Sequence, residues 1–128
     1  MIRNFDKETS PLTEYEKNVL LPAVADILRN RNGKYKAITS GKMIDYYLQD
    51  YLVSPPRLRK VINHIRTKGI VKCLIASSKG YYIAESREEI EAYLEGLKGR
   101  EDAIRQINRS IKLQTNKLFP KKKKLVAC

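Results

Sequence analysis

Apolar residues recur three or four positions apart in four long segments of the chain, which indicates four helices with one buried face each. These segments are residues 14–32, 41–51, 55–68 and 87–117. Residues 70–76 and 81–84 are instead rich in aliphatic, β-branched and aromatic residues, and the SSKG sequence between them predicts a β-hairpin. Residues 36–38 are too short to assign firmly and are consistent with a brief strand.

Helix-capping and helix-breaking residues set the boundaries of these segments. The TEYE sequence from Thr13 to Glu16 is a capping box, in which each of these two side chains bonds the other's backbone N–H. Pro22 lies inside the first segment and should bend or divide that helix. Ser54 precedes a proline at the first helical position of the third segment, and Gly69 ends it.

The pattern predicts an α+β, mostly helical protein made of four parts. They are a flexible N-terminus (residues 1–12), a compact domain (13–84), a long C-terminal helix (85–118) and a basic flexible tail (119–128).

The predicted third helix separates apolar from polar residues around its circumference. Its buried face is formed by Leu58, Val61, Ile62 and Ile65. At about 100° per residue, Lys60, Asn63 and Thr67 lie on the opposite face, and basic residues flank both sides.

The chain carries a net charge of +12, concentrated in two places. Residues 37–84 contain eight basic and two acidic side chains, and residues 119–128 contain four lysines and no acid. Residues 51–84 contain no acidic residue at all, whereas a solvated charged face normally mixes both signs. This distribution predicts a polyanionic partner, with nucleic acid favoured over acidic lipid or an acidic protein.

Two stretches of the sequence resemble a known class of protein. VSPPRLRKVINHIRTKG looks like the turn and recognition helix of a winged helix-turn-helix domain. LIASSKGYYIAESREEIEAYLEGLKGREDAI looks like the wing and following helix of small winged-helix proteins of phages, prophages and other mobile elements. The resemblance covers about residues 13–107. It implies a three-helix core with a β-hairpin wing and a role in binding duplex DNA.

In such a domain the third helix enters the major groove, where arginine can read guanine and asparagine can read adenine. The expected base contacts are Arg59, Lys60 and Asn63. The expected phosphate contacts are Lys42, Arg57, Arg66 and Lys68. The tip of the wing would add Ser77, Ser78 and Lys79. The tail would add nonspecific phosphate contacts from Lys121, Lys122, Lys123 and Lys124.

Other interpretations remain open at this point. The basic helix face is also consistent with a solvated surface, and the protein with a protein-interaction adaptor or, more weakly, an RNA-binding protein. The long C-terminal helix carries a seam of apolar residues near heptad spacing, interrupted by Arg100 and Gln114. It would either form a homodimer through residues 85–118 or fold back on the first helix.

The sequence argues against catalysis and against a membrane span. It has one histidine, two cysteines and no Gly-rich phosphate loop, so neither an enzyme, a metal site nor a cofactor is expected. No apolar run approaches the ~20 residues of a membrane helix, and no secretory signal is evident, so we expect a cytoplasmic protein. Cys73 lies in an apolar run and is expected in the core; Cys128 is expected to be a reduced thiol.

Overall fold

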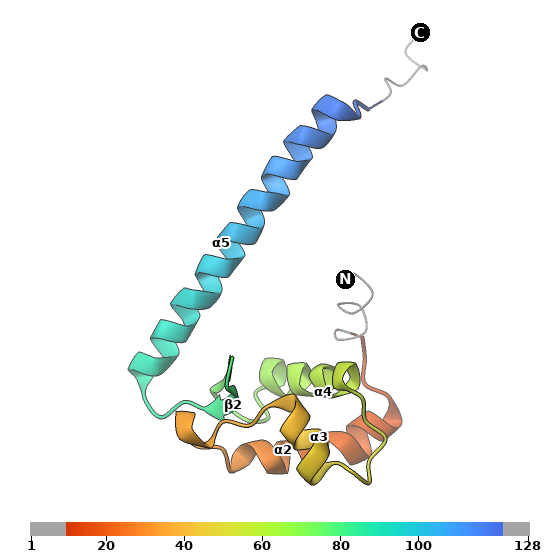
Figure 1. The fold of residues 1–128 in the computed structure, drawn as a ribbon, viewed down its shortest axis with the longest axis vertical. Coiled ribbons are helices and arrows are strands. Elements are labelled where there is room, and N and C mark those ends of the chain that lie inside the picture. The colour runs from red at the N-terminus through yellow and green to blue at the C-terminus, as the bar shows by residue number, and fades with distance from the viewer. Residues whose placement is uncertain (1–9, 122–128) are drawn as a thin grey trace. The chain divides into compact units, whose positions relative to one another are not determined.

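The computed structural model describes residues 10–121, which are mostly helical with one small two-stranded antiparallel sheet (Figure 1). The elements are η1 (Glu16–Leu20), α2 (Leu21–Arg29), η2 (Lys34–Lys36), α3 (Ser40–Tyr47), α4 (Pro55–Lys68), β1 (Leu74–Ser77), β2 (Gly80–Ile83) and α5 (Arg87–Leu118). The chain divides after Ile90 into two units, and each is described by itself. The sequence expectations for residues 1–9 and 122–128 lie outside the described residues.

The first predicted helix begins with the expected capping box and contains a π-helical turn just before its proline. The Thr13 N–H donates to Glu16 Oε1 at 2.9 Å, and the Glu16 N–H donates to Thr13 Oγ1 at 3.2 Å. Residues Glu16–Leu20 form a π-helical turn, and α-helix continues from Leu21, with Pro22 in the first turn of α2. Since proline has no N–H and its ring crowds the preceding turn, a widened turn at this place is the expected response.

Helix α3 is shorter than the sequence predicted, and its last residue, Tyr47, does not pack in the core. The helix ends at Tyr47, four residues before the predicted end. Met43 and Leu48 are fully buried, but Tyr47 is about half exposed. Its hydroxyl accepts a hydrogen bond from Arg31 Nη2 at 2.9 Å instead of packing in the core.

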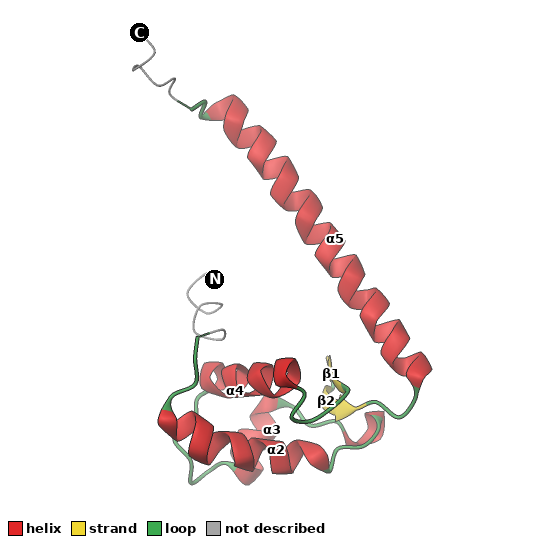
Figure 2. Cartoon of the chain, turned by 180° about the vertical axis from the view of Figure 1, so that it is seen from behind, coloured by secondary structure: helices red, strands yellow, loops and turns green. Residues whose placement is uncertain are grey.

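Helices α2, α3 and α4 enclose the core of the first unit. Helix α4 contacts both α2 and α3, and Figure 2 shows it lying along one side of them. The residues with no exposed surface, or almost none, come from η1, all three helices and the turn after α3. They are Leu20, Val24, Ala25, Leu28, Met43, Leu48, Leu58, Val61, Ile62 and Ile65. All four predicted core residues of α4 are therefore confirmed.

The hairpin forms with a two-residue turn, and the segment before α3 pairs with it. Strands β1 and β2 are antiparallel, and their register runs from Leu74 opposite Ile83 to Ser77 opposite Gly80. Ile38 forms an isolated antiparallel bridge with Tyr81, through N–H···O bonds of 3.0 and 2.8 Å. The brief strand predicted at residues 36–38 is thus reduced to a single bridging residue.

Cys73 does not lie in the core, so that expectation is wrong. Its backbone is left-handed, with φ of 58°, and the residue is exposed. The first strand begins only at Leu74, because the apolar run from Ile70 makes a turn before it enters the sheet. Val71 and Leu74 take the buried positions on either side of that turn.

Helix α5 begins at the predicted residue and extends over 32 residues. Ser86 caps it, since its Oγ accepts the Glu89 N–H at 3.2 Å, and the Glu85 N–H donates back to Glu89 Oε1 at 2.8 Å. Within residues 10–121, no helix combines the length and the apolar character that a membrane span requires.

Candidate nucleic-acid interface

Helix α4 has well-formed ends and holds most of the residues of the predicted site. Ser54 Oγ accepts the Arg57 N–H at 3.3 Å, and Gly69 ends the helix in the left-handed conformation with φ of 67°. Its apolar face is fully buried, so the helix is fixed in rotation about its own axis. The orientation of every polar side chain on α4 follows from that fixed rotation.

Lys60 is not on an exposed face, which corrects the placement inferred from the helical pattern. Only 9% of the residue is accessible, and its Nζ lies 2.7 Å from Oε1 of the buried Glu16. A lysine held this way is not available to read a base edge in the described conformation. The helical pattern missed this because α4 is covered on two sides, by the apolar core and by the start of the first helix.

Arg57 is also occupied within the protein, although we expected it to contact phosphate. Its Nε donates to Glu16 Oε2 at 2.7 Å, and its Nη1 donates to the Leu52 carbonyl at 3.1 Å. Its guanidinium lies over the Tyr15 ring, 5.0 Å from the centroid, in a cation–π contact. The Tyr15 hydroxyl in turn accepts the Leu52 N–H at 2.8 Å. Arg57 therefore joins the chain before α4 to the first helix.

Glu16 is the centre of this buried cluster and was not identified from the sequence beyond its capping role. Burial by itself would raise the pKa of its carboxyl group. The hydrogen bonds from Lys60, the Thr13 N–H and Arg57, together with the positive charge of Lys60, lower the pKa by more than burial raises it. The pKa falls from 4.5 to about 2. The carboxylate therefore stays ionised at neutral pH and balances part of the charge of Arg57 and Lys60.

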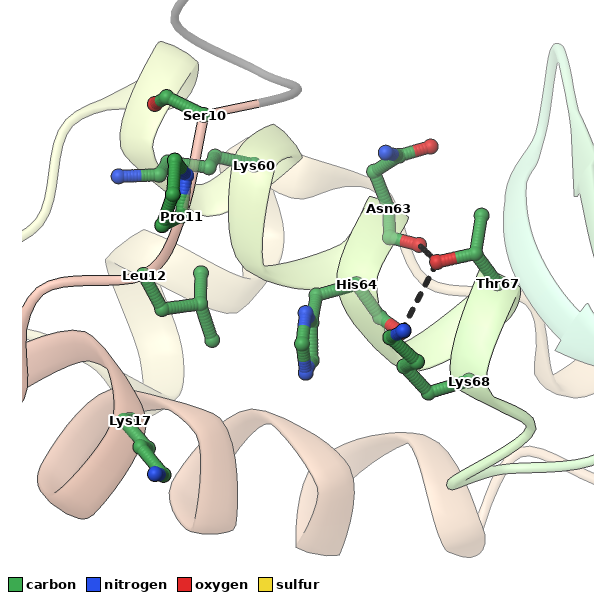
Figure 3. A pocket seen from close by; sticks show the side chains of 9 residues that line it. All are labelled: Ser10, Pro11, Leu12, Lys17, Lys60, Asn63, His64, Thr67 and Lys68. Carbon is green, nitrogen blue, oxygen red and sulfur yellow. Dashed lines mark hydrogen bonds between the residues drawn. The ribbon is translucent and has the colours of Figure 1, made fainter.

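The outward side of α4 is formed by the remaining polar residues. Asn63, Arg59 and Arg66 are partly exposed, while Thr67 and Lys68 are exposed. Arg59 and Arg66 already have interaction partners within the chain, so a ligand would have to compete for them. The Thr67 hydroxyl donates to the main-chain carbonyl of Asn63 at 2.9 Å, and Figure 3 shows the Asn63 side chain pointing away from the helix.

A pocket of about 480 Å³ lies between α4 and the segment that precedes the first helix. In Figure 3, Ser10 and Pro11 lie beside Lys60, and the His64 ring lies between Leu12 and Lys68. The lining residues are Ser10, Pro11, Leu12, Lys17, Lys60, Asn63, His64, Thr67 and Lys68. Residues 10–12 thus lie against one flank of α4, and the flexibility predicted for residues 1–12 stays a prediction.

The hairpin presents its predicted residues at an exposed tip. Ser77, Ser78 and Lys79 are all exposed. The Ser77 hydroxyl is used within the turn, because it donates to the Gly80 carbonyl at 2.9 Å and accepts the Lys79 N–H at 3.2 Å. Ser78 and Lys79 are left as the outermost side chains. Figures 1 and 2 both place the hairpin beside the C-terminal end of α4.

The other predicted contacts lie on separate elements. Lys42 is exposed in the first turn of α3, where its N–H donates to Thr39 Oγ1 at 3.2 Å. Lys72, which the sequence analysis did not single out, is exposed in the turn before β1. Of the tail lysines, Lys121 is exposed, and Lys122, Lys123 and Lys124 lie outside the described residues.

The described part of the chain contains no group of three or more His, Cys, Asp or Glu side chains placed to hold a metal ion. Comparison with protein-family models, with curated proteins and with solved structures found no match. The assignment of a function therefore depends on the geometry and charge of this surface.

Proposed function

We propose that the protein binds duplex DNA as a winged helix-turn-helix domain, with α4 as the recognition helix and the β1–β2 hairpin as the wing. One observation carries the proposal. A helix with a completely buried apolar face adjoins a hairpin within residues 51–84, a stretch that has seven basic and no acidic side chains. The order of three helices followed by a hairpin, and the bridge from Ile38 to the hairpin, agree with this type of domain.

Two residues on the outward side of α4 are the proposed base readers. Arg59 suits the paired acceptors of guanine, and Asn63 suits the donor–acceptor pair of adenine. Phosphate contacts are assigned to the exposed and partly exposed cations around them, which fix the register without reading sequence. These are Lys42, Arg66, Lys68, Lys72 and Lys79. Lys60 and Arg57 are left out of the DNA contacts, because both are paired with Glu16.

The Glu16 cluster has a positioning role in this proposal. Its ion pairs from Glu16 to Arg57 and Lys60 hold α4 against the first helix and so fix the orientation of α4 relative to that helix. It also reduces the positive charge on the flank that residues 10–12 cover, so the attraction for phosphate is strongest on the opposite flank and at the hairpin.

The biological role follows from the resemblance of the sequence to phage and mobile-element proteins. We infer a transcription regulator or an accessory factor for replication or excision, acting in the cytoplasm or nucleoid of a bacterial host.

The first test is selection of a random duplex DNA pool, with sequencing of the bound fraction and affinity measured against salt. We expect an enriched motif and binding that persists at about 150 mM salt. Motif-free binding that is lost as salt rises would contradict sequence-specific recognition and favour the protein-interaction adaptor.

The second test assigns the binding to α4. The double variant Arg59→Ala, Asn63→Ala should reduce affinity for the selected motif by about 2–6 kcal/mol, because each bidentate base contact contributes about 1–3 kcal/mol. A control variant, Lys98→Ala with Lys112→Ala, removes two exposed cations from α5. Equal losses in the two variants, both folded by circular dichroism, would show that only overall charge matters and would exclude α4 as the reading element.

A further inference from the structure

Helix α5 carries a heptad repeat of apolar residues. One of its two seam positions is aliphatic in every heptad, and the polar residues Arg100 and Gln114 fall only on the other. Every seventh residue from Ile90 onward is a large aliphatic residue: Ile90, Leu97, Ile104, Ile111 and Leu118. The second seam position of each heptad is occupied in turn by Tyr93, Arg100, Ile107 and Gln114. The repeat spans four heptads, about the length at which such a pattern indicates a coiled coil.

This seam is exposed in the single chain. Ile104, Ile107 and Ile111 are 66%, 59% and 54% accessible, and Leu118 is 72% accessible. The buried core cluster of the described residues is formed entirely by side chains between Leu20 and Leu74. The first unit therefore builds its buried core from its own side chains.

The two halves of α5 carry opposite charge. Residues 87–102 contain six acidic and three basic side chains, a net charge of −3. Residues 103–118 contain four basic and no acidic side chains, a net charge of +4. Interaction with the helix dipole accounts for charges in the first and last turns only, whereas this segregation extends over the whole helix.

We propose that α5 pairs with α5 of a second copy of this chain in an antiparallel coiled coil. The antiparallel direction places the acidic half of each helix beside the basic half of the other. A parallel pair would instead align like charges, and would bring the two copies of Arg100 face to face in the seam. The register that aligns the two seams completely places Ile104 of one copy beside Ile107 of the other, and Leu97 beside Gln114.

Sedimentation equilibrium of the full chain without DNA tests the association, and its result does not depend on the proposed DNA binding. We expect a dimer. Ile107→Glu places a charge in the seam and should raise the dissociation constant at least about tenfold. Leu113→Glu is the matched control, since Leu113 is 61% accessible but lies off the seam, and it should leave the dimer intact. A monomeric full chain, or a dimer that Ile107→Glu leaves unchanged, would overturn the proposal.

Disulfide crosslinking tests the direction of the helices. In a background with Cys73→Ser and Cys128→Ser, Leu97→Cys alone should give no crosslinked dimer under mild oxidation. Mixed with a Gln114→Cys chain, it should give a crosslinked heterodimer. Efficient crosslinking of Leu97→Cys to itself would show a parallel pair and overturn the antiparallel arrangement.

Discussion

At the scale of single residues, the stability of the first unit depends strongly on one buried carboxylate. Glu16 is 3% accessible and accepts hydrogen bonds from cations of α4. Glu16→Gln leaves Lys60 buried without a counter-charge, so we expect a loss of about 3 kcal/mol in the free energy of unfolding. Urea unfolding at pH 7 measures it. Glu14→Gln, at an exposed position on the same turn, should change stability by less than about 0.5 kcal/mol.

The same carboxylate predicts how stability depends on pH. Its pKa is about 2 in the folded protein, below its ordinary value of 4.5. The ionised form therefore contributes its full stabilisation above about pH 5, and this contribution is lost as the pH falls from 4.5 toward 2. Stability measured across this range should fall by about 3 kcal/mol more in the wild type than in Glu16→Gln. Parallel pH profiles for the two proteins would contradict the assignment.

Gly80 is the residue at which the hairpin meets the segment before α3. Its φ is +118°, and a Cβ there would collide with main-chain atoms of Ile38 and Thr39. Since backbone does not move aside as a side chain can, Gly80→Ala should cost at least about 3 kcal/mol. Gly41→Ala is the control, because a Cβ at Gly41 meets no atom within 4 Å. Thermal unfolding should show a clearly lower Tm for the first variant only.

At the scale of secondary-structure elements, sequence patterns predicted correctly the features that depend on interactions between residues close in sequence. The capping box, the ends of α4 and the two-strand hairpin all depend on residues close in sequence, and each is confirmed. At Pro22 the helix continues, with a π-helical turn ahead of the proline. The errors arise where distant segments decide. Lys60 was assigned to the surface because the helical pattern of α4 shows only one apolar face. In the structure its ammonium group is buried against Glu16, which lies 44 residues away in the sequence.

Cys73 and Tyr47 show two further limits of sequence patterns. An apolar run indicates burial on average but does not show where the chain turns, and at Cys73 the turn comes one residue before the strand. Tyr47 fits an apolar stripe by spacing, yet its hydroxyl has a partner in Arg31 on the surface. For the candidate site, the sequence located the helix and hairpin, but only the structure separates the outward residues from the buried ion pairs.

Helix α5 contains two glycines that weaken it. A Cβ at Gly96 or Gly99 would meet no neighbouring atom within 4 Å. The double variant Gly96→Ala, Gly99→Ala should therefore stabilise the helix by about 0.5–1 kcal/mol per site. Helix content at 222 nm should be retained to a higher temperature than in the wild type. Ala92→Gly, at an exposed position of the same helix, should have the opposite effect; equal melting of all three would contradict the prediction.

At the scale of the whole molecule, the basic charge of the C-terminal tail predicts a salt effect on DNA binding. Residues 121–124 are four lysines. Each phosphate that is neutralised contributes about 0.9 to the slope of log affinity against log salt concentration. Deleting residues 121–128 should lower the slope by up to about 3.6 without changing the selected motif. An unchanged slope would show that the tail does not contact DNA.

The Glu16 cluster also separates the polar residues of α4 lengthwise into two strips. Arg59, Asn63 and Arg66 do not contribute to the core cluster, whereas Arg57 and Lys60 are tied to a carboxylate in another helix. In a saturation library of α4, DNA preference should diverge along the first strip while the second tolerates change only together with Glu16. Under the proposed DNA binding, new target sites would then be reached by substitutions outside the core cluster, whereas a change at Arg57 or Lys60 would have to be matched at Glu16.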